Sequence, residues 1–390
     1  MATRLSPPER PHILFLYSDT GGGHRSAAEA IREALELEFP GQLDLEMVDI
    51  LRKYTPPPFN FLPEIYPTLS RYPRLWKLGY QLSDGPYQSR MAYRSVWPYV
   101  RFRLKQLVVD HPHSLLVSVH QLINEPLGRL IKGRDQHFAT VVTDMVSTHA
   151  AWFDRRASLV VVPTEAARKR ALQLGLEPDR VQVTGMPVAQ RFCLPSVDRS
   201  ALRARLGWPQ DQAVILLVGG GEGMGPLIPT ALAIDAANLP ATLVVVAGRN
   251  ERARQQLENH AWQMPRRIYG FTREMPEMMR AADILVTKAG PGTISEAFIA
   301  GLPLVLFSRM PGQEDGNVTH VVKGGAGVWA PGPEQVTGVL RRWLENPAER
   351  QQAAECSLRL ATPQATRHTA RLLAELAMKS VAHDSGQRDP

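Results

Sequence analysis

Residues Asp19-Thr20-Gly21-Gly22-Gly23-His24-Arg25-Ser26 combine glycines with a histidine directly after an apolar run. Glycines let backbone N–H groups approach a ligand, and the N-terminus of a following helix favours phosphate or a developing oxyanion. Imidazole has an unperturbed pKa of about 6.5, so His24 can accept a proton from a hydroxyl at neutral pH. Gly22, Gly23 and His24 are therefore candidate site residues, with a purely structural glycine turn as the alternative.

Three familiar loop types do not match this pattern. No Gly-Lys-Ser/Thr follows the glycines, as a P-loop requires, and the Gly-x-Gly-x-x-Gly of a dinucleotide site is missing. Asp19-Thr20-Gly21 is also found in aspartic proteases, but that chemistry needs a second carboxylate, and the chain has no second Asp-Thr/Ser-Gly.

Three further loops carry groups suited to a nucleotide-linked sugar. Gly219 to Pro226 repeats the glycine-rich pattern, and Thr287 to Glu296 joins a strand to a helix, so its amides and Thr293 can receive a diphosphate. Glu296 can accept both hydroxyls of a ribose. Pro311 to Asn317 is dense in side chains that chelate vicinal hydroxyls. The alternatives are a solvated helix surface for Glu296 and an ordinary polar turn for Pro311 to Asn317.

Neither a metal nor a cofactor is expected. No Asp-x-Asp occurs in the chain, which argues against a transferase that holds its diphosphate through a metal, so fixed dipoles and cations must replace the ion. Cys193 and Cys356 form neither a metal-ligand pattern nor a disulfide framework, which fits a reducing compartment.

Buried strands alternating with amphipathic helices must position these loops. Apolar runs at 12–17, 43–50, 114–120, 138–143 and 159–162 predict one series of strands, and runs at 213–218, 242–247, 268–271, 284–287 and 304–307 predict a second. Helical stretches such as Ala27 to Phe39 indicate parallel sheets. We expect two doubly wound α/β domains, at 1–190 and 200–380, with Pro187 to Pro209 as an irregular linker and the last helix as a candidate to pack back on the first domain.

The segment 53–105 departs from this pattern because it holds seven of the nine tyrosines of the chain, interleaved with arginines and lysines. Aromatic and cationic side chains together are typical of a lipid headgroup interface, so a membrane-docking insert is one interpretation. The alternatives are an aromatic core beneath a basic face and a base-stacking groove for single-stranded nucleic acid.

A net charge of +7 and an isoelectric point near 9.5 favour an anionic partner. No apolar run approaches the roughly 20 residues of a spanning helix, and no signal peptide is visible. The composition therefore predicts a cytosolic or peripheral protein.

Together these motifs resemble the monogalactosyldiacylglycerol synthase family, which is similar to diacylglycerol glucosyltransferases and to the lipid-linked N-acetylglucosaminyltransferase of peptidoglycan synthesis. The likeness runs from about His12 to about Trp343. The motifs that carry it, in family order, are Ser18 to Arg25, Thr140 to Asp144 with Trp152-Phe153, Gly219 to Pro226, Gly248-Arg249-Asn250, Lys288 to Ile294 and Gly312 to Val318.

The resemblance implies a GT-B fold, with two Rossmann-like domains facing across a cleft, and an inverting transfer of galactose from UDP-galactose to the hydroxyl of 1,2-diacylglycerol without an obligatory metal. His24 would act as the base, the N-terminal domain would bind acceptor and membrane, and the C-terminal domain would bind the nucleotide sugar. The implied donor-binding residues are Gly219, Gly220, Glu222, Gly223, Met224, Gly248, Arg249, Asn250, Gly270 and Phe271 (uracil), Lys288, Gly290, Gly292, Thr293 and Ile294 (diphosphate), Glu296 (ribose), and Gln313, Glu314 and Asn317 (hexose). Pro57 and Phe59 fall in the lipid-capturing region, and Asp144 and His149 in a further family motif.

Several alternatives stay open at this point. The same mechanism fits a UDP-glucose-dependent diacylglycerol glucosyltransferase or a UDP-GlcNAc transferase to a polyprenyl-linked acceptor, and a non-catalytic nucleotide-sugar or lipid sensor is an alternative of another class. We expect a UDP-sugar, diacylglycerol and an anionic membrane surface as partners and no nucleic acid. Only a short segment precedes the first strand, so we expect a peripheral protein on the cytoplasmic face of a bacterial inner membrane. The sequence does not indicate an oligomeric state.

Overall fold

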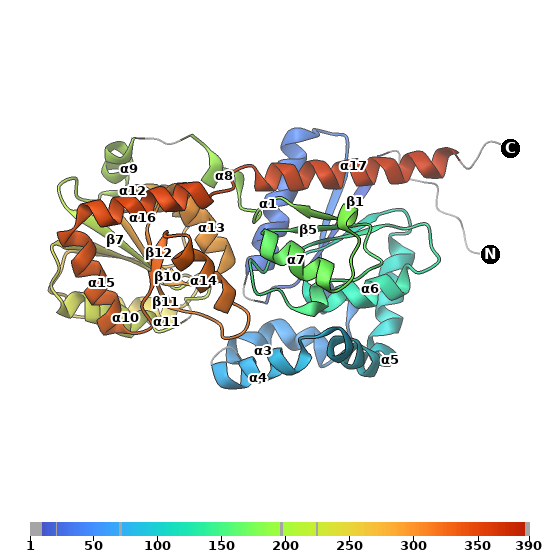
Figure 1. Cartoon of the computed structure of the whole chain (residues 1–390), viewed down its shortest axis with the longest axis horizontal. Helices are drawn as coiled ribbons and strands as arrows, with labels where there is room; N and C mark the ends of the chain where they lie inside the picture. The colour runs from blue at the N-terminus through green and yellow to red at the C-terminus, as the bar shows by residue number, and fades with distance from the viewer. Residues whose placement is uncertain (1–9, 21, 70–71, 196–197, 224, 387–390) are drawn as a thin grey trace. The chain divides into compact units, whose positions relative to one another are not determined.

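The computed structural model describes residues 10–20, 22–69, 72–195, 198–223 and 225–386, and the chain divides into two compact α/β units (Figure 1). The first unit comprises the chain up to Gln190 together with the chain from Gln364 onward, and the second is Arg191–Pro363. The first unit is therefore assembled from two separate segments of the sequence.

The sheet of the first unit contains six parallel strands in the order β2-β1-β3-β4-β5-β6. These are β1 (His12–Tyr17), β2 (Asp44–Asp49), β3 (Leu115–Ser118), β4 (Phe138–Val141), β5 (Leu159–Val162) and β6 (Val181–Val183). The chain begins at β1, moves outward to β2 and then crosses over to β3 on the other side. The strand order thus reverses between β1 and β3, and ligands of doubly wound sheets bind at such a switch point.

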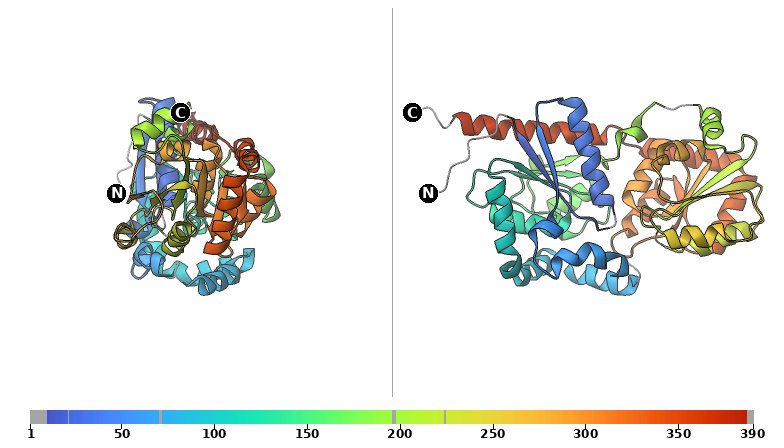
Figure 2. Two further views of the ribbon diagram at one scale, coloured as in Figure 1. Left: turned by 90° about the vertical axis from the view of Figure 1, so that its left-hand side faces the viewer. Right: turned by 180° about the vertical axis from the view of Figure 1, so that it is seen from behind.

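Helices α1 (Gly23–Glu38) and α17 (Ala365–Gly386) lie side by side on one face of this sheet, as Figures 1 and 2 show. Ile31 and Leu35 of α1 share one buried cluster with Leu373 and Ala377 of α17. Glu38 also forms an ion pair of 2.5 Å with Arg371. The end of the chain therefore completes the core of the first unit.

The opposite face is covered by α5 (Pro86–Asp110), α6 (Asn124–Leu130) and α7 (Glu165–Gln173). Between β2 and α5 the chain forms α2 (Ile50–Tyr54), the short helix η1 (Phe59–Phe61), α3 (Leu62–Leu69) and α4 (Pro73–Ser83). The later part of α5 is anchored because Leu104 and Leu107 are buried, whereas Tyr87 and Met91 in its first turns are exposed. The aromatic and basic segment is thus helical and only partly absorbed into the core.

The second unit repeats the architecture with six parallel strands in the order β12-β11-β10-β7-β8-β9. Its strands are β7 (Ala213–Val218), β8 (Ala241–Val246), β9 (Arg266–Tyr269), β10 (Ile284–Lys288), β11 (Leu304–Ser308) and β12 (Gly327–Trp329). Its helices include α10 (Leu227–Ala236), α11 (Glu251–Glu258), α12 (Met275–Ala281), α13 (Pro291–Ala300), α14 (Asp315–Lys323), α15 (Pro333–Glu345) and α16 (Pro347–Leu360). Here the strand order reverses between β7 and β10.

Ten strands lie at or within a few residues of the predicted apolar runs, whereas β6 and β12 were not predicted. The prediction of an irregular stretch from Pro187 to Pro209 is wrong, because it contains α8 (Gln190–Cys193) and α9 (Arg199–Leu206). Asp198 caps α9 by accepting a hydrogen bond from the Ala201 amide, and Gly207 ends the helix in the left-handed region at φ 65°.

Candidate active site and donor-binding loops

His24 stands in the first turn of α1, at the switch point of the first sheet. Its Nδ1 lies 2.8 Å from the Thr143 hydroxyl, which follows β4. The His24 ring also makes an edge contact of 4.6 Å with the ring of His120, which follows β3. The histidine predicted from the glycine loop is therefore held by residues from two loops, after β3 and after β4, at the same edge of the sheet.

The surroundings of His24 keep its imidazole neutral. Burial lowers the pKa of His24 to about 4, against the smaller effect of a hydrogen bond to the Val119 backbone, which raises it. The pKa of His120 is also lowered, by burial first and by His24 second, because two adjacent imidazoles disfavour a second positive charge. At neutral pH the His24 ring is consequently able to accept a proton.

Trp152 and Asp144 form the inner wall of this site. Trp152 is fully buried, its ring centroid lies 6.0 Å from that of His24, and its Nε1 donates a 2.7 Å hydrogen bond to the Asp144 carboxylate. Asp144 therefore holds the Trp152 indole beside His24. Thr143 and His120 were not among the predicted site residues. Each is the last residue of a predicted apolar run, 114–120 for His120 and 138–143 for Thr143, and a polar side chain at that position is the signal that points to them.

The other predicted acceptor residues are distributed around the first unit. Gly22 adopts φ 76° at the N-cap of α1. A Cβ added to Gly23 would meet no atom within 4 Å, so no other group covers the backbone of Gly23 beside His24. Pro57 is exposed and Phe59 is half-buried against the core near η1. His149 precedes the short helix η3 (Ala150–Trp152) and caps it, because its Nδ1 accepts from the Ala151 amide at 3.1 Å.

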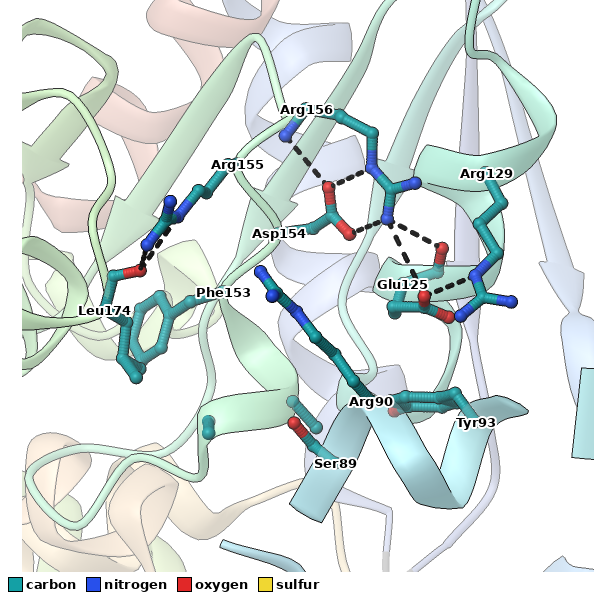
Figure 3. Close-up of a pocket in the computed structure, with 12 residues that line it drawn as sticks. Ser89, Arg90, Tyr93, Glu125, Arg129, Phe153, Asp154, Arg155, Arg156 and Leu174 are labelled. Carbon is teal, nitrogen blue, oxygen red and sulfur yellow. Dashed lines mark hydrogen bonds and ion pairs between the residues drawn. The ribbon is translucent and has the colours of Figure 1, made fainter. Parts of the chain in front are cut away.

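A cavity of about 310 Å³ lies between α5 and the chain after η3 (Figure 3). Arg129 pairs with Glu125, and Arg156 pairs with Asp154, on one side of it. Arg90 extends into the space from α5 and has no hydrogen-bond or ionic partner among the residues that the structure describes. The pocket is thus lined by an excess of cations and suits an anionic group.

In the second unit, the loops after β7, β8 and β9 pack backbone against backbone. The Arg249 amide donates to the Gly221 carbonyl at 2.8 Å, and the Asn250 side chain donates to the Gly223 carbonyl at 3.3 Å. Gly223 and Gly248 have φ of 59° and 61°, and a Cβ on Gly248 would lie 2.4 Å from the Gly221 oxygen. Only glycine fits these positions.

The same loops offer a flat platform. Phe271, directly after Gly270, is 58% exposed, and the Arg249 guanidinium stacks 4.6 Å from its ring centroid. Arg249 is also paired with Glu222 at 2.7 Å. An exposed aromatic face beside a guanidinium is suited to stack on a planar base.

Lys288, at the end of β10, stands at the switch point of the second sheet. Its Nζ lies 2.6 Å from Oε1 of Glu314, whose Oε2 accepts from the Met310 amide at 2.7 Å. A Cβ added to Gly220 would lie 3.5 Å from the Lys288 side chain. Both oxygens of the buried Glu314 are thus engaged, and this carboxylate orients Lys288 beside the first glycine loop.

The predicted hexose and diphosphate residues are brought to the same edge. Asn317 is buried and its amide donates to the Ala289 carbonyl at 2.9 Å, which ties α14 to the loop after β10. Gly219 is buried, Gln313 is half-buried, and Met224 lies outside the described residues. A Cβ added to Gly290 would meet the Lys288 amine at 3.0 Å.

Helix α13 presents its N-terminus at this edge. An added Cβ on Gly292 would meet nothing within 4 Å, and Thr293 is partly exposed. Ile294 is buried and its amide already donates to the Gly290 carbonyl, so it supports the helix. Burial raises the pKa of Glu296 to about 7, with a smaller opposing effect from Arg191.

Two searches of the described residues complete the description of the candidate site. Within these ranges, no three His, Cys, Asp or Glu side chains cluster in a way suited to a metal ion. None of the described helices combines the length and apolar character needed to cross a bilayer.

Comparison with known proteins places these features in a family. The family model of monogalactosyldiacylglycerol (MGDG) synthase matches residues 24–188, and that of the glycosyltransferase family 28 C-terminal domain matches residues 214–368. The probable MGDG synthase of Glycine max is 35% identical over 370 residues, covering 92% of this chain and 70% of that protein. MGDG synthase 1 of Arabidopsis thaliana is 34% identical over 371 residues, covering 92% and 69%.

Solved structures show the same fold at low identity. MurG of Acinetobacter baumannii superposes with a TM-score of 0.60 at 16% identity, covering 93% of this chain and 99% of that one. HepE of Anabaena, solved with UDP-glucose, gives a TM-score of 0.55 at 15% identity, covering 95% and 99%. The predicted fold class, GT-B with two Rossmann-like units, is confirmed.

One expectation is contradicted. The curated relatives from soybean, Arabidopsis and spinach are all named as chloroplastic. The expected location on the cytoplasmic face of a bacterial inner membrane is therefore wrong, because it relied on the short segment before the first strand, which carries no information about compartment. With relatives at this identity along most of its length, and with its two parallel sheets, the chain is a glycosyltransferase and belongs to the monogalactosyldiacylglycerol synthase family.

Proposed function

We propose that this protein transfers galactose from UDP-galactose to the hydroxyl of 1,2-diacylglycerol, with inversion at the anomeric carbon. The observation that carries the proposal is the neutral His24 imidazole at the switch point of the first sheet. The names of the curated relatives favour galactose and diacylglycerol over glucose, N-acetylglucosamine or a polyprenyl acceptor.

In the proposed reaction, His24 Nε2 takes the proton of the acceptor hydroxyl as its oxygen attacks the anomeric carbon. The bond between this carbon and the UDP oxygen breaks, and its electron pair leaves with UDP. The tautomer that leaves Nε2 free places a proton on Nδ1, which then donates to the Thr143 hydroxyl. Because a hydroxyl can accept as well as donate, Thr143 is compatible with this tautomer and holds the ring in place.

The second unit would bind the donor and stabilise departing UDP. Phe271 with Arg249 would receive the uracil, and Glu296 the ribose hydroxyls. The N-terminus of α13 and Lys288 would offset the charge that develops on the diphosphate, as fixed dipoles and a cation do in other transferases. Because these groups already supply positive potential, we propose that the reaction needs neither a metal nor a cofactor.

The acceptor would reach the protein from a lipid surface. Leu75, Leu78 and Leu82 of α4 are 60%, 54% and 67% exposed. Residues 72–105 contain Asp84 as their only acid among several arginines and lysines. An exposed leucine stripe with surrounding cations is suited to an anionic bilayer. The free Arg90 in the cavity of Figure 3 adds to this preference.

A transfer assay tests the reaction. Purified protein is incubated with diacylglycerol in vesicles and, in parallel, UDP-galactose, UDP-glucose or UDP-GlcNAc, and the product is identified by mass spectrometry. We expect a galactolipid, and we expect His24→Ala to abolish its formation while UDP-galactose affinity changes less than twofold. His368→Ala, on the exposed side of α17, is the matched control. Full turnover of His24→Ala would refute the assignment of the base.

Vesicle flotation tests the docking surface separately. Leu78→Ser with Leu82→Ser should reduce flotation with phosphatidylcholine and phosphatidylglycerol vesicles, because two exposed side chains that would be buried in lipid are made polar. Leu358→Ser, which alters an exposed leucine of α16, should float like the wild type. Equal flotation of both variants would contradict docking through α4.

A further inference from the structure

Helix α4 has two faces with different partners. The exposed leucines Leu75, Leu78 and Leu82 recur at spacings of three and four residues and share one face. Trp76, Tyr80 and Ser83 lie on a different face, and all three are less exposed than the leucines. The leucine stripe of α4 therefore faces away from the protein, and the face with the indole and hydroxyl groups faces the protein.

Residues 143–152 follow β4, and we name them the 143–152 segment. The face of α4 opposite the leucines contacts this segment. The Tyr80 hydroxyl donates to the Ser147 carbonyl at 2.9 Å. Ser83 Oγ lies 3.2 Å from His149 Nε2, and the rings of Tyr80 and His149 meet edge to face at 4.9 Å. Three contacts thus fix the middle of this segment to one helix.

Asp84, the residue directly after α4, strengthens the same attachment. Its Oδ1 accepts from the Ala150 amide at 2.9 Å and lies 3.1 Å from the Arg170 guanidinium of α7. A carboxylate that receives both a backbone amide and a guanidinium makes charge-assisted hydrogen bonds, which are stronger than neutral ones. The end of α4 is therefore tied to η3 and to the body of the first unit.

The two ends of the 143–152 segment contact the catalytic candidate. Thr143, at its beginning, lies 2.8 Å from His24 Nδ1. Trp152, at its end, stands against the His24 ring and is held by Asp144. One short stretch of chain therefore touches the docking helix in its middle and the base at both ends.

We propose that the 143–152 segment couples docking of α4 on a lipid surface to the alignment of His24, with Tyr80, Ser83 and His149 as positioning residues. This inference rests on the docking surface given under the proposed function. When the leucine stripe is buried in lipid, α4 is immobilised, and its polar face fixes the backbone of the segment. The Thr143 hydroxyl then holds the His24 ring in the orientation in which it accepts the proton of the acceptor hydroxyl. Without the surface, α4 and the segment move together and the base is less well aligned.

The coupling is tested with Tyr80→Phe combined with Ser83→Ala, which removes the two hydroxyls and keeps the aromatic ring and the helix. Ser380→Ala, which removes a hydroxyl of α17 that donates to the carbonyl four residues earlier as Ser83 does, is the matched control outside the docking segment. Three quantities are measured for each protein: flotation with phosphatidylcholine and phosphatidylglycerol vesicles, amide hydrogen exchange of residues 143–152 with and without these vesicles, and turnover of diacylglycerol in them.

In the wild type and in Ser380→Ala, we expect vesicles to slow exchange of residues 143–152 severalfold. In the double variant, flotation should be unchanged, the slowing should be lost, and kcat should fall about tenfold, the combined effect of two ordinary hydrogen bonds. Its KM for UDP-galactose should stay within twofold of the wild type. A residue that only stabilised the fold would not separate kcat from KM and flotation in this way.

The outcomes distinguish the two levels of the proposal. If the wild type does not float, docking through α4 fails, and the coupling fails with it. If the wild type floats but exchange of residues 143–152 is unaffected by vesicles, the docking stands and the coupling is overturned. The coupling is equally overturned if the double variant keeps both the slowed exchange and wild-type kcat. Should the double variant fold poorly by circular dichroism, Tyr80→Phe alone serves, with an expected loss of about threefold in kcat.

Discussion

Donor binding should depend on pH through one carboxyl group, Glu296 on α13. Burial raises its pKa to about 7 from an ordinary value of 4.5. A carboxylate accepts two ribose hydroxyls, whereas its protonated form loses part of that capacity. With a pKa of about 7, roughly one eleventh of the group is ionised at pH 6 and roughly ten elevenths at pH 8. If binding follows the ionised form, affinity for UDP-galactose rises up to about tenfold from pH 6 to pH 8.

Isothermal titration of UDP-galactose in the absence of acceptor measures this effect. UDP-galactose is the suitable probe because its diphosphate is esterified at both ends and does not titrate between pH 6 and pH 8. Glu296→Gln should bind with lower affinity than the wild type at pH 8 and show no slope, whereas Glu334→Gln, at an exposed position of α15, should retain the wild-type slope. An affinity of the wild type that is equal at pH 6 and pH 8 would refute the reasoning.

The same shift affects the stability of the free protein in a defined direction. The pKa of Glu296 is higher in the folded than in the unfolded state, so the folded state binds the proton more tightly between pH 4.5 and pH 7. The resulting stabilisation is fully present below pH 4.5 and is lost as the pH rises through about 7. Glu296→Gln should therefore melt at a higher temperature than the wild type at pH 8, and the difference should shrink towards pH 5.

Three further results are expected. Gly248→Ala forces a Cβ into the left-handed region and against a backbone carbonyl, so donor affinity should fall at least tenfold in a binding titration. Gly338→Ala, at a position within α15 where a Cβ would meet no other atom, should leave donor affinity unchanged. Trp152→Phe leaves a buried oxygen of Asp144 without its indole donor, and urea titration should show a loss of about 1–3 kcal/mol, which an unchanged midpoint would contradict. Because burial lowers the pKa of His24 to about 4, kcat at saturating donor should fall on the acid side only as the pH approaches about 4, and an acid limb centred near 6.5 would exclude this histidine as the base.

The fold was predictable where the sequence pattern has a single physical explanation. Runs such as Leu159–Val162 contain only β-branched and aliphatic residues and are buried on both faces, so they can form only internal strands of a parallel sheet. The edge strands Val181–Val183 and Gly327–Trp329 were missed because three residues, half exposed, carry no such pattern. Helix α9 was missed because the prolines around it outweighed the capping signals of Asp198 and Gly207.

The site was predictable from its glycines and its histidine, but not from the partners that surround them. His24 follows a predicted strand and begins a predicted helix, and both patterns are local in the sequence. Thr143 lies 119 positions away and His120 lies 96 positions away in the sequence, and only the order of strands brings them together. The engagement of both Glu314 oxygens with Lys288 and the Met310 amide likewise depends on the register between β10 and β11.

The packing of α17 on the first unit affects the order in which the two units can fold during synthesis on the ribosome. The second unit is a continuous stretch, Arg191–Pro363, and all of its residues are synthesised before α17 emerges. The first unit starts earlier but lacks Leu373 and Ala377, which fill its core beside α1, until α17 has been synthesised. The unit synthesised first is thus the last to complete its core. A chain truncated after Pro363 would expose the apolar side chains of α1 that α17 normally covers, and such exposed surface favours aggregation or chaperone binding.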